Sequence, residues 1–128
     1  MLIKSAIVFG FAFLTVGILG FIPGVVTNSM LLGVFHVNPA HNWVHLISGV
    51  AALACALVGP SASRAYFQVF GVIYGIVAIL GLFVGHGLVL GLIANNGADV
   101  VLHIGIAAMA LYLGYGLVRE SPATAVGV

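Results

Sequence analysis

The five residues with a fixed charge divide the chain into long uncharged intervals. Lys4 is followed by 59 uncharged residues, Arg64 by 34, and Asp99 by 19, up to the adjacent Arg119 and Glu120. Since a membrane-spanning helix needs about 20 apolar residues, these intervals have room for two, one and one spans. Only 4% of the residues are charged, against roughly 25% in a soluble domain. The sequence therefore predicts an all-α integral membrane protein with four transmembrane helices.

Helix-capping residues help to place the ends of these spans. Asn38 followed by Pro39 is typical of a helix start, and Gly59 followed by Pro60 is typical of a helix end. Asn96 can cap the last helix. In a single domain of residues 1–128, we expect helices at about 5–26, 39–59, 64–85 and 97–118. The links at 25–37 and 85–95 are too apolar for free loops, so we expect them in the headgroup region or folded over the helices.

The cations predict the orientation of the chain in the membrane. Lys4 precedes the first predicted helix, Arg64 lies between the second and the third, and Arg119 follows the fourth. All three then lie on one side, and cations favour the cytoplasmic side. We therefore expect a multi-pass protein of the plasma (inner) membrane with both termini in the cytoplasm.

An internal repeat relates the two halves of the sequence. The segment "FGFAFLTVGILGFIPG" from Phe9 aligns with "FGVIYGIVAILGLFVG" from Phe70 at an offset of 61. The segment "LGVFHVNPAHNWVH" from Leu32 aligns with "LGLIANNGADVVLH" from Leu90 at an offset of 58. The repeat predicts a tandem-duplicated helical hairpin with units at about 5–59 and 64–118. Both units enter the membrane from the same side, so a pseudo-two-fold axis should run along the membrane normal.

Several segments also resemble a known family. They are "GFIPGV", "LLGVFHVNPAHNWVHLISGV", "YFQVFGVIYGIVAILG" and "NGADVVLH". In these segments, and over about residues 5–117, the chain is similar to the bacterial four-span membrane proteins grouped as domain of unknown function 4383. The resemblance implies a fold and no particular activity. In the family pattern a second asparagine follows the later aspartate, as Asn42 follows His41, whereas this chain has Val100 there.

Two polar pairs lie at matching positions of the repeat. His41 and His45 are four residues apart, as are Asp99 and His103, so each pair shares one face of its helix. If the second and fourth helices meet across the axis, three imidazoles and one carboxylate form a reasonable tetrahedral shell for Zn or Cu. The repeat thus predicts an outward-side metal site of His41, His45, Asp99 and His103.

Structural roles for the same residues remain open. Asp99 lies three residues after Asn96, where a carboxylate can complete a capping box. His45 and His103 lie deeper and need partners, which could be a hydrogen bond between them, or bonds to the backbone beside an Asp99–His41 pair. A haem ligated by His45 and His103 is a weaker alternative.

Two functions follow from these readings. In the first, this is a small membrane protein whose site between the second and fourth helices binds a transition metal. In the second, the polar residues form a structural clasp in an accessory or scaffold subunit of a larger membrane complex or of a homo-oligomer. Nothing supplies a nucleophile, a base and a substrate pocket together, which argues against an enzyme. Three cations in total exclude nucleic acid as a partner.

Overall fold

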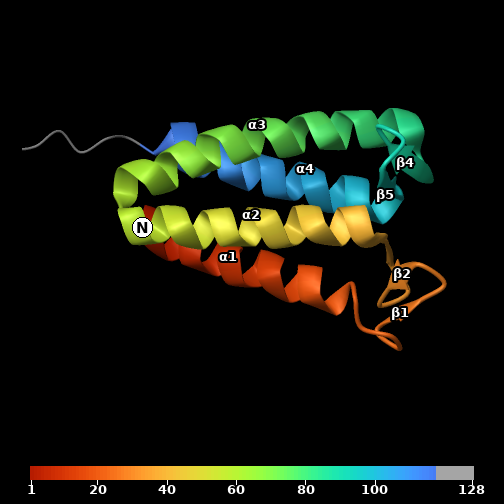
Figure 1. The fold of residues 1–128 in the computed structure, drawn as a ribbon. Coiled ribbons are helices and arrows are strands. Elements are labelled where there is room, and N and C mark those ends of the chain that lie inside the picture. Colours follow the sequence, from red (N-terminus) through yellow and green to blue (C-terminus); the bar gives the residue numbers. More distant parts are fainter. Residues whose placement is uncertain (118–128) are drawn as a thin grey trace, which may run out of the picture.

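The structure is a computed structural model that describes residues 1–117, and four long helices run alongside one another in this part of the chain (Figure 1). They are α1 (Leu2–Leu19), α2 (Pro39–Val58), α3 (Pro60–Val84) and α4 (Gly97–Leu111), which continues as the π-helical turn η1 (Tyr112–Gly116). Each span, with η1 counted as part of the fourth, is long and apolar enough to cross a membrane. The predicted set of four candidate spans is therefore confirmed.

Small residues allow the helices to pack in two close pairs, α1 with α2 and α3 with α4. Gly10 of α1 lies against Leu53 of α2, and Gly71 of α3 lies against Leu111 of α4, in both cases too closely for a Cβ atom. Buried aromatic rings fill the space between the pairs, with Phe13 and Phe70 in an edge contact at a centroid distance of 5.2 Å. Their edge-to-face geometry is favourable for aromatic pairs.

Two of the predicted helix boundaries are wrong. The first helix ends at Leu19 rather than near 26, because the chain turns at Gly20 and continues into a strand pair. The third begins at Pro60 rather than near 64, since proline suits the first position of a helix. Gly59, at φ 135°, is therefore the one residue between α2 and α3. The predicted starts of α2 and α4 are confirmed, and residue 118, the predicted end of the last helix, lies outside the described residues.

Both apolar links contain short antiparallel strands, which the all-α prediction did not include. In the first link, β1 (Val26–Thr27), β2 (Met30–Leu31) and β3 (Phe35–His36) form a small sheet, and in the second, β4 (Gly87–Val89) pairs with β5 (Ile93–Asn95). Leu32 and Leu90 adopt matching left-handed turns, at φ 53° and φ 54°. Strand pairing satisfies backbone groups that an apolar setting would leave without water.

The two links exchange hydrogen bonds in a reciprocal pattern. The side-chain amide of Asn38 donates to the carbonyl of Leu92 at 2.8 Å, and that of Asn96 donates to the carbonyl of Val34 at 2.8 Å. The two bonds are related by the offset of 58 seen in the sequence. We call them the asparagine seam. Since Asn38 and Asn96 are also the N-caps of α2 and α4, the seam holds the starts of these helices together.

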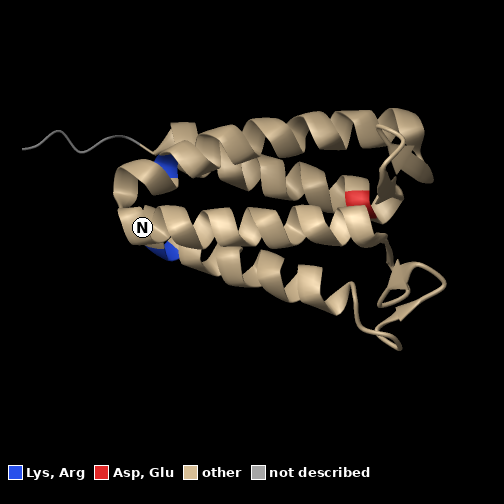
Figure 2. Cartoon of the chain, in the orientation of Figure 1, with Lys and Arg blue, Asp and Glu red and all other residues tan. Residues whose placement is uncertain are grey.

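The charged residues of the described part separate along the long axis. Lys4 lies in the first turn of α1 and Arg64 in the second turn of α3, whereas Asp99 lies in the first turn of α4. Figure 2 shows the basic residues at the end where the N-terminus is found and the acidic residue at the opposite end, beside the links. Arg64 donates to the carbonyls of Gly114 and Leu117 at 3.1 and 2.9 Å. The guanidinium thus donates hydrogen bonds to carbonyl groups that have no partner within the helix, because they lie at its C-terminal end. Arg119, the third cation used for the orientation, lies outside the described residues.

Candidate metal site

Three histidines from two helices meet at the end of the molecule that carries the links. His41 and His45 come from α2 and His103 from α4, and all three residues are 1–5% exposed. One ring nitrogen of each lies within 4.8 Å of those of the other two. We call these three residues the histidine cluster. Metal–nitrogen bonds of about 2.0–2.1 Å hold two ligand nitrogens at most about 4.2 Å apart, so binding an ion would draw the rings closer together. The structure thus brings together three of the four residues proposed as metal ligands.

A small cavity adjoins the cluster. Its volume is about 30 Å³, and its walls include all three histidines together with apolar side chains from α2, α3 and β5. A space above about 10–15 Å³ can hold a water molecule, so this cavity has room for a single ion or water. A tetrapyrrole needs a pocket of roughly 300 Å³ or more. The cavity therefore suits an ion and lacks room for a haem.

The hydrogen bonds of the rings show which nitrogen atoms are free. His41 Nδ1 lies 3.1 Å from the carbonyl oxygen of His36. Because a carbonyl only accepts, Nδ1 of His41 carries the proton and Nε2 keeps its lone pair. Such a bond to a backbone carbonyl commonly orients a metal-binding imidazole. Nδ1 of His45 and Nδ1 of His103 are buried and have no hydrogen-bond partner.

Aromatic side chains fix the two deeper rings. Phe13 of α1 contacts His45 edge to face at a centroid distance of 5.4 Å, and Tyr74 of α3 contacts His103 in the same way at 5.4 Å. Tyr74 is held in turn by a 3.3 Å hydrogen bond between its hydroxyl and that of Ser48. Each helix pair therefore supplies one aromatic ring that limits the motion of one histidine.

Asp99 caps a helix and is not part of the histidine cluster. Its Oδ2 accepts hydrogen bonds from the backbone N–H of Asn96 at 2.9 Å and of His36 at 3.1 Å. The Asn96 side chain accepts from the backbone N–H of Asp99 at 3.0 Å, which completes the predicted capping box. Within residues 1–117, the structure has neither a side-chain bond from Asp99 to His41 nor one between His45 and His103. Both polar pairs that were considered as structural roles are therefore missing.

Asn95 is a structural residue that the sequence did not single out. The Asn42 amide donates to the carbonyl of Gly20 at 2.7 Å, and the Asn95 amide donates to the carbonyl of Gly81 at 3.2 Å. Gly20 and Gly81 are equivalent in the repeat, so Asn95 takes the place of the asparagine that Val100 replaces. Alignment of the two repeats does not reveal this role of Asn95, because Asn42 aligns with Val100 of α4. Asn95 reaches Gly81 from β5, the strand before that helix.

Comparison with known proteins shows the family of the chain. Residues 4–116 match a protein family described as a domain of unknown function (DUF4383). The chain belongs to this family. No curated protein and no solved structure matches it. Since the description of the DUF4383 family names no activity, the function has to be argued from the site itself.

Two further histidines of this DUF4383 chain stack on the outside of the links. His36 and His86 lie nearly parallel, with an interplanar angle of 6° and a centroid distance of 4.7 Å. His36 Nδ1 also lies 3.3 Å from the carbonyl oxygen of Asn95. His86 is exposed, and neither ring belongs to the histidine cluster. The stacked pair joins the first link to the second.

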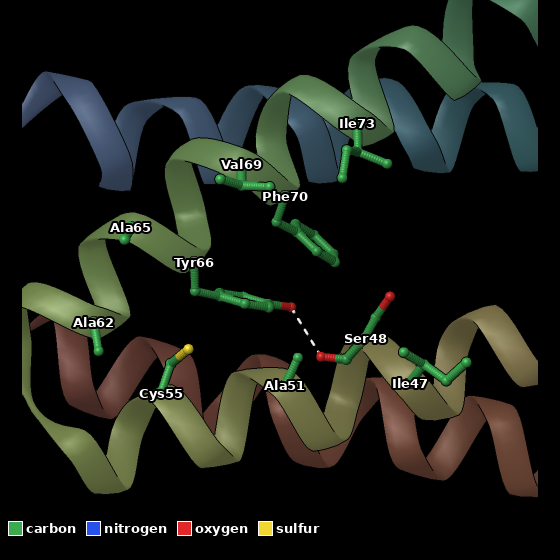
Figure 3. Close-up of a pocket in the computed structure, with 10 residues that line it drawn as sticks. All are labelled: Ile47, Ser48, Ala51, Cys55, Ala62, Ala65, Tyr66, Val69, Phe70 and Ile73. Atoms are coloured by element: carbon green, nitrogen blue, oxygen red, sulfur yellow. Dashed lines mark hydrogen bonds between the residues drawn. The ribbon is translucent and has the colours of Figure 1, made fainter.

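A wide apolar groove of the DUF4383 chain opens between α2 and α3, and none of the three clustered histidines lines it (Figure 3). Its volume is about 450 Å³. Tyr66 points its hydroxyl at the backbone carbonyl of Ser48, to which it donates at 3.2 Å. The Ser48 hydroxyl bonds to that of Tyr74. Apart from the thiol of Cys55, the polar side-chain groups that line the groove are thus already paired, and they form no catalytic set.

Proposed function

We propose that this protein is an integral membrane protein that binds one transition-metal ion through His41, His45 and His103. The observation that carries the proposal is the histidine cluster, in which three buried imidazoles converge on one small cavity. Imidazole nitrogen is a good ligand for Zn and Cu. Asp99 was predicted as a fourth ligand, and we now assign its carboxylate to the cap of α4.

The unpaired nitrogens favour an ion over a purely structural role. A buried polar atom without a partner costs about 1–3 kcal/mol. The cluster contains two such atoms, Nδ1 of His45 and Nδ1 of His103. A clasp would be expected to pair them with each other or with the backbone. An ion offers the lone pairs of all three rings a common partner, and the backbone carbonyl of His36 already orients one of those rings.

We place the site on the outward side of the plasma (inner) membrane. Four apolar helices support insertion in a bilayer, and the matching contacts of the two halves support a duplicated hairpin with its axis along the membrane normal. Lys4 and Arg64 lie in the first two turns of α1 and α3, at the end opposite the starts of α2 and α4, where the cluster lies. Cations favour the cytoplasmic side, so the N-terminus and, from the position of Arg119, the C-terminus would be cytoplasmic.

A second candidate function is a non-catalytic accessory or scaffold subunit of a larger membrane complex or homo-oligomer. The asparagine seam and the capping box favour it, since the seam joins the starts of α2 and α4 and the capping box buries polar groups at the start of α4, both for structural reasons alone. In this case the histidines would complete a polar clasp, and the protein would act through its partners.

Metal analysis of the detergent-purified full chain separates the two candidates. We expect close to one Zn or Cu ion per chain after loading, and loss of the ion in the variants His45→Ala and His103→Ala. His86→Ala is the matched control, because this exposed histidine lies outside the cluster. A wild-type protein that stays free of metal after loading, with an unchanged melting temperature, would refute the metal site and leave the clasp.

A further inference from the structure

We infer that the histidine cluster selects monovalent copper, Cu(I), over the divalent ion Zn(II). This inference rests on the proposed metal-binding function and specifies the ion. It draws on the charge around the cluster, on the number of ligands within reach and on the shape of the cavity.

The ligands provide no negative charge. All three are imidazoles, which are neutral when they bind a metal. Asp99 is the only acidic residue in the described part of the chain, and both hydrogen bonds to its Oδ2 come from backbone N–H groups. The ion and its three neutral ligands carry a charge of two with a divalent ion and of one with a monovalent ion, and the nearby Asp99 carboxylate lowers either sum by one. The cost of burying charge rises with its square, so it is smaller for the monovalent ion.

The helix ends add to this difference. The cluster lies in the first two turns of α2 and close to the start of α4. Helix N-termini carry a partial positive charge, which repels a cation in proportion to its own charge. In the described residues, Asp99 is the one opposing charge, and it lies in the first turn of α4. A singly charged ion meets half of the repulsion that a doubly charged ion meets.

The coordination number points the same way. Zn(II) takes four ligands in almost all protein sites, and with three histidines it would add a water. The remaining cavity wall is formed by Val44, Ile73, Val77, Ile93 and the ring of Tyr74. The Tyr74 hydroxyl already bonds to Ser48, and the other four of these side chains have no polar group that could hold such a water. A buried water normally needs two to four polar partners. A three-coordinate ion has no such need, and Cu(I) is stable with three imidazole ligands.

A competition experiment on the full chain in detergent micelles tests the inference. Under anaerobic conditions, Cu(I) is titrated against bicinchoninate, and in parallel Zn(II) is titrated against a colorimetric chelator. We expect one Cu(I) per chain, bound at least about 100-fold more tightly than Zn(II). X-ray absorption of the copper-loaded protein should show three nitrogen neighbours. His103→Gln should lose Cu(I), and the control His86→Gln should keep it.

The outcomes distinguish the two levels of the proposal. If wild-type protein binds neither ion, the metal-binding function itself is refuted. If Zn(II) binds as tightly as Cu(I), or if the copper has a fourth ligand, the function stands and the selectivity is refuted. Val44→Asp provides a further test, because it adds a carboxylate to the cavity wall. In this variant the ratio of the Zn(II) dissociation constant to the Cu(I) dissociation constant should fall at least tenfold. An unchanged ratio would contradict the charge argument.

Discussion

The equivalence of Asn95 and Asn42 leads to a sharp prediction at Gly81. A Cβ atom at Gly81 would lie 2.7 Å from Asn95 Oδ1 and 2.9 Å from Val100 Cγ2. The substitution Gly81→Ala therefore displaces the Asn95 side chain, which donates to the carbonyls of Gly81 and Gly85. Asn95 is 1% exposed, so a displaced amide finds no water in place of these partners.

The expected loss can be estimated from these contacts. Overfilling a packed site costs about 1–3 kcal/mol, and each lost hydrogen bond costs about 0.5–1.5 kcal/mol. Replacing glycine by alanine inside a helix returns about 0.5–1 kcal/mol. With two bonds lost, Gly81→Ala should therefore lower the free energy of unfolding by about 1–5 kcal/mol, with a central value of about 3 kcal/mol.

Gly75 provides a matched control on the same helix. A Cβ atom there would lie 3.9 Å from Ala107 Cβ, which is an ordinary contact. Gly75→Ala should leave stability unchanged or raise it by up to about 1 kcal/mol. The measurement is unfolding in mixed micelles with a rising fraction of SDS, followed by circular dichroism. Equal stability of the two variants would show that Asn95 does not hold α3 in the way described.

Three further predictions concern the seam, the cationic end and the orientation. Asn96→Ala removes the N-cap of α4 and a hydrogen bond to the first link, so the free energy of unfolding in the same assay should fall by about 1–3 kcal/mol. An unfolding curve identical to that of the wild type would contradict this. Arg64→Ala removes the donor to two carbonyls near the end of the fourth helix, so hydrogen exchange over residues 112–117 should quicken; unchanged exchange would argue against this contact. In intact cells, a membrane-impermeant maleimide should label Leu92→Cys and not Ser61→Cys, and the reverse pattern would invert the proposed orientation.

The parts of the fold that depend on local chemistry could be predicted from the sequence. Long uncharged intervals indicated the four candidate spans, because few sequences of that kind are stable outside a bilayer. The starts of α2 and α4 were predictable since Asn38 and Asn96 are strong N-caps. The short strands of the links were not predictable. Their turns use Leu32 and Leu90 in the left-handed region, which leucine rarely adopts.

The site was predictable only in part, for a related reason. Repeat symmetry indicated that α2 and α4 would bring their histidines together, and three of them do meet. The position of Asp99 depended on a competition that the sequence does not decide. Two backbone N–H groups, those of Asn96 and His36, donate hydrogen bonds to Oδ2 of Asp99. One of them comes from the other half of the chain, 63 positions away, and is visible only once the links are folded.

The two helix pairs are connected in different ways at the two ends of the bundle. At the cationic end the covalent connection is Gly59, a single residue with wide conformational freedom. At the opposite end the pairs are linked by hydrogen bonds, which include those of the Asn38 and Asn96 side chains. If the pairs moved apart, these bonds would break while the covalent connection at Gly59 stayed intact, so an ion in the histidine cluster would leave toward the links.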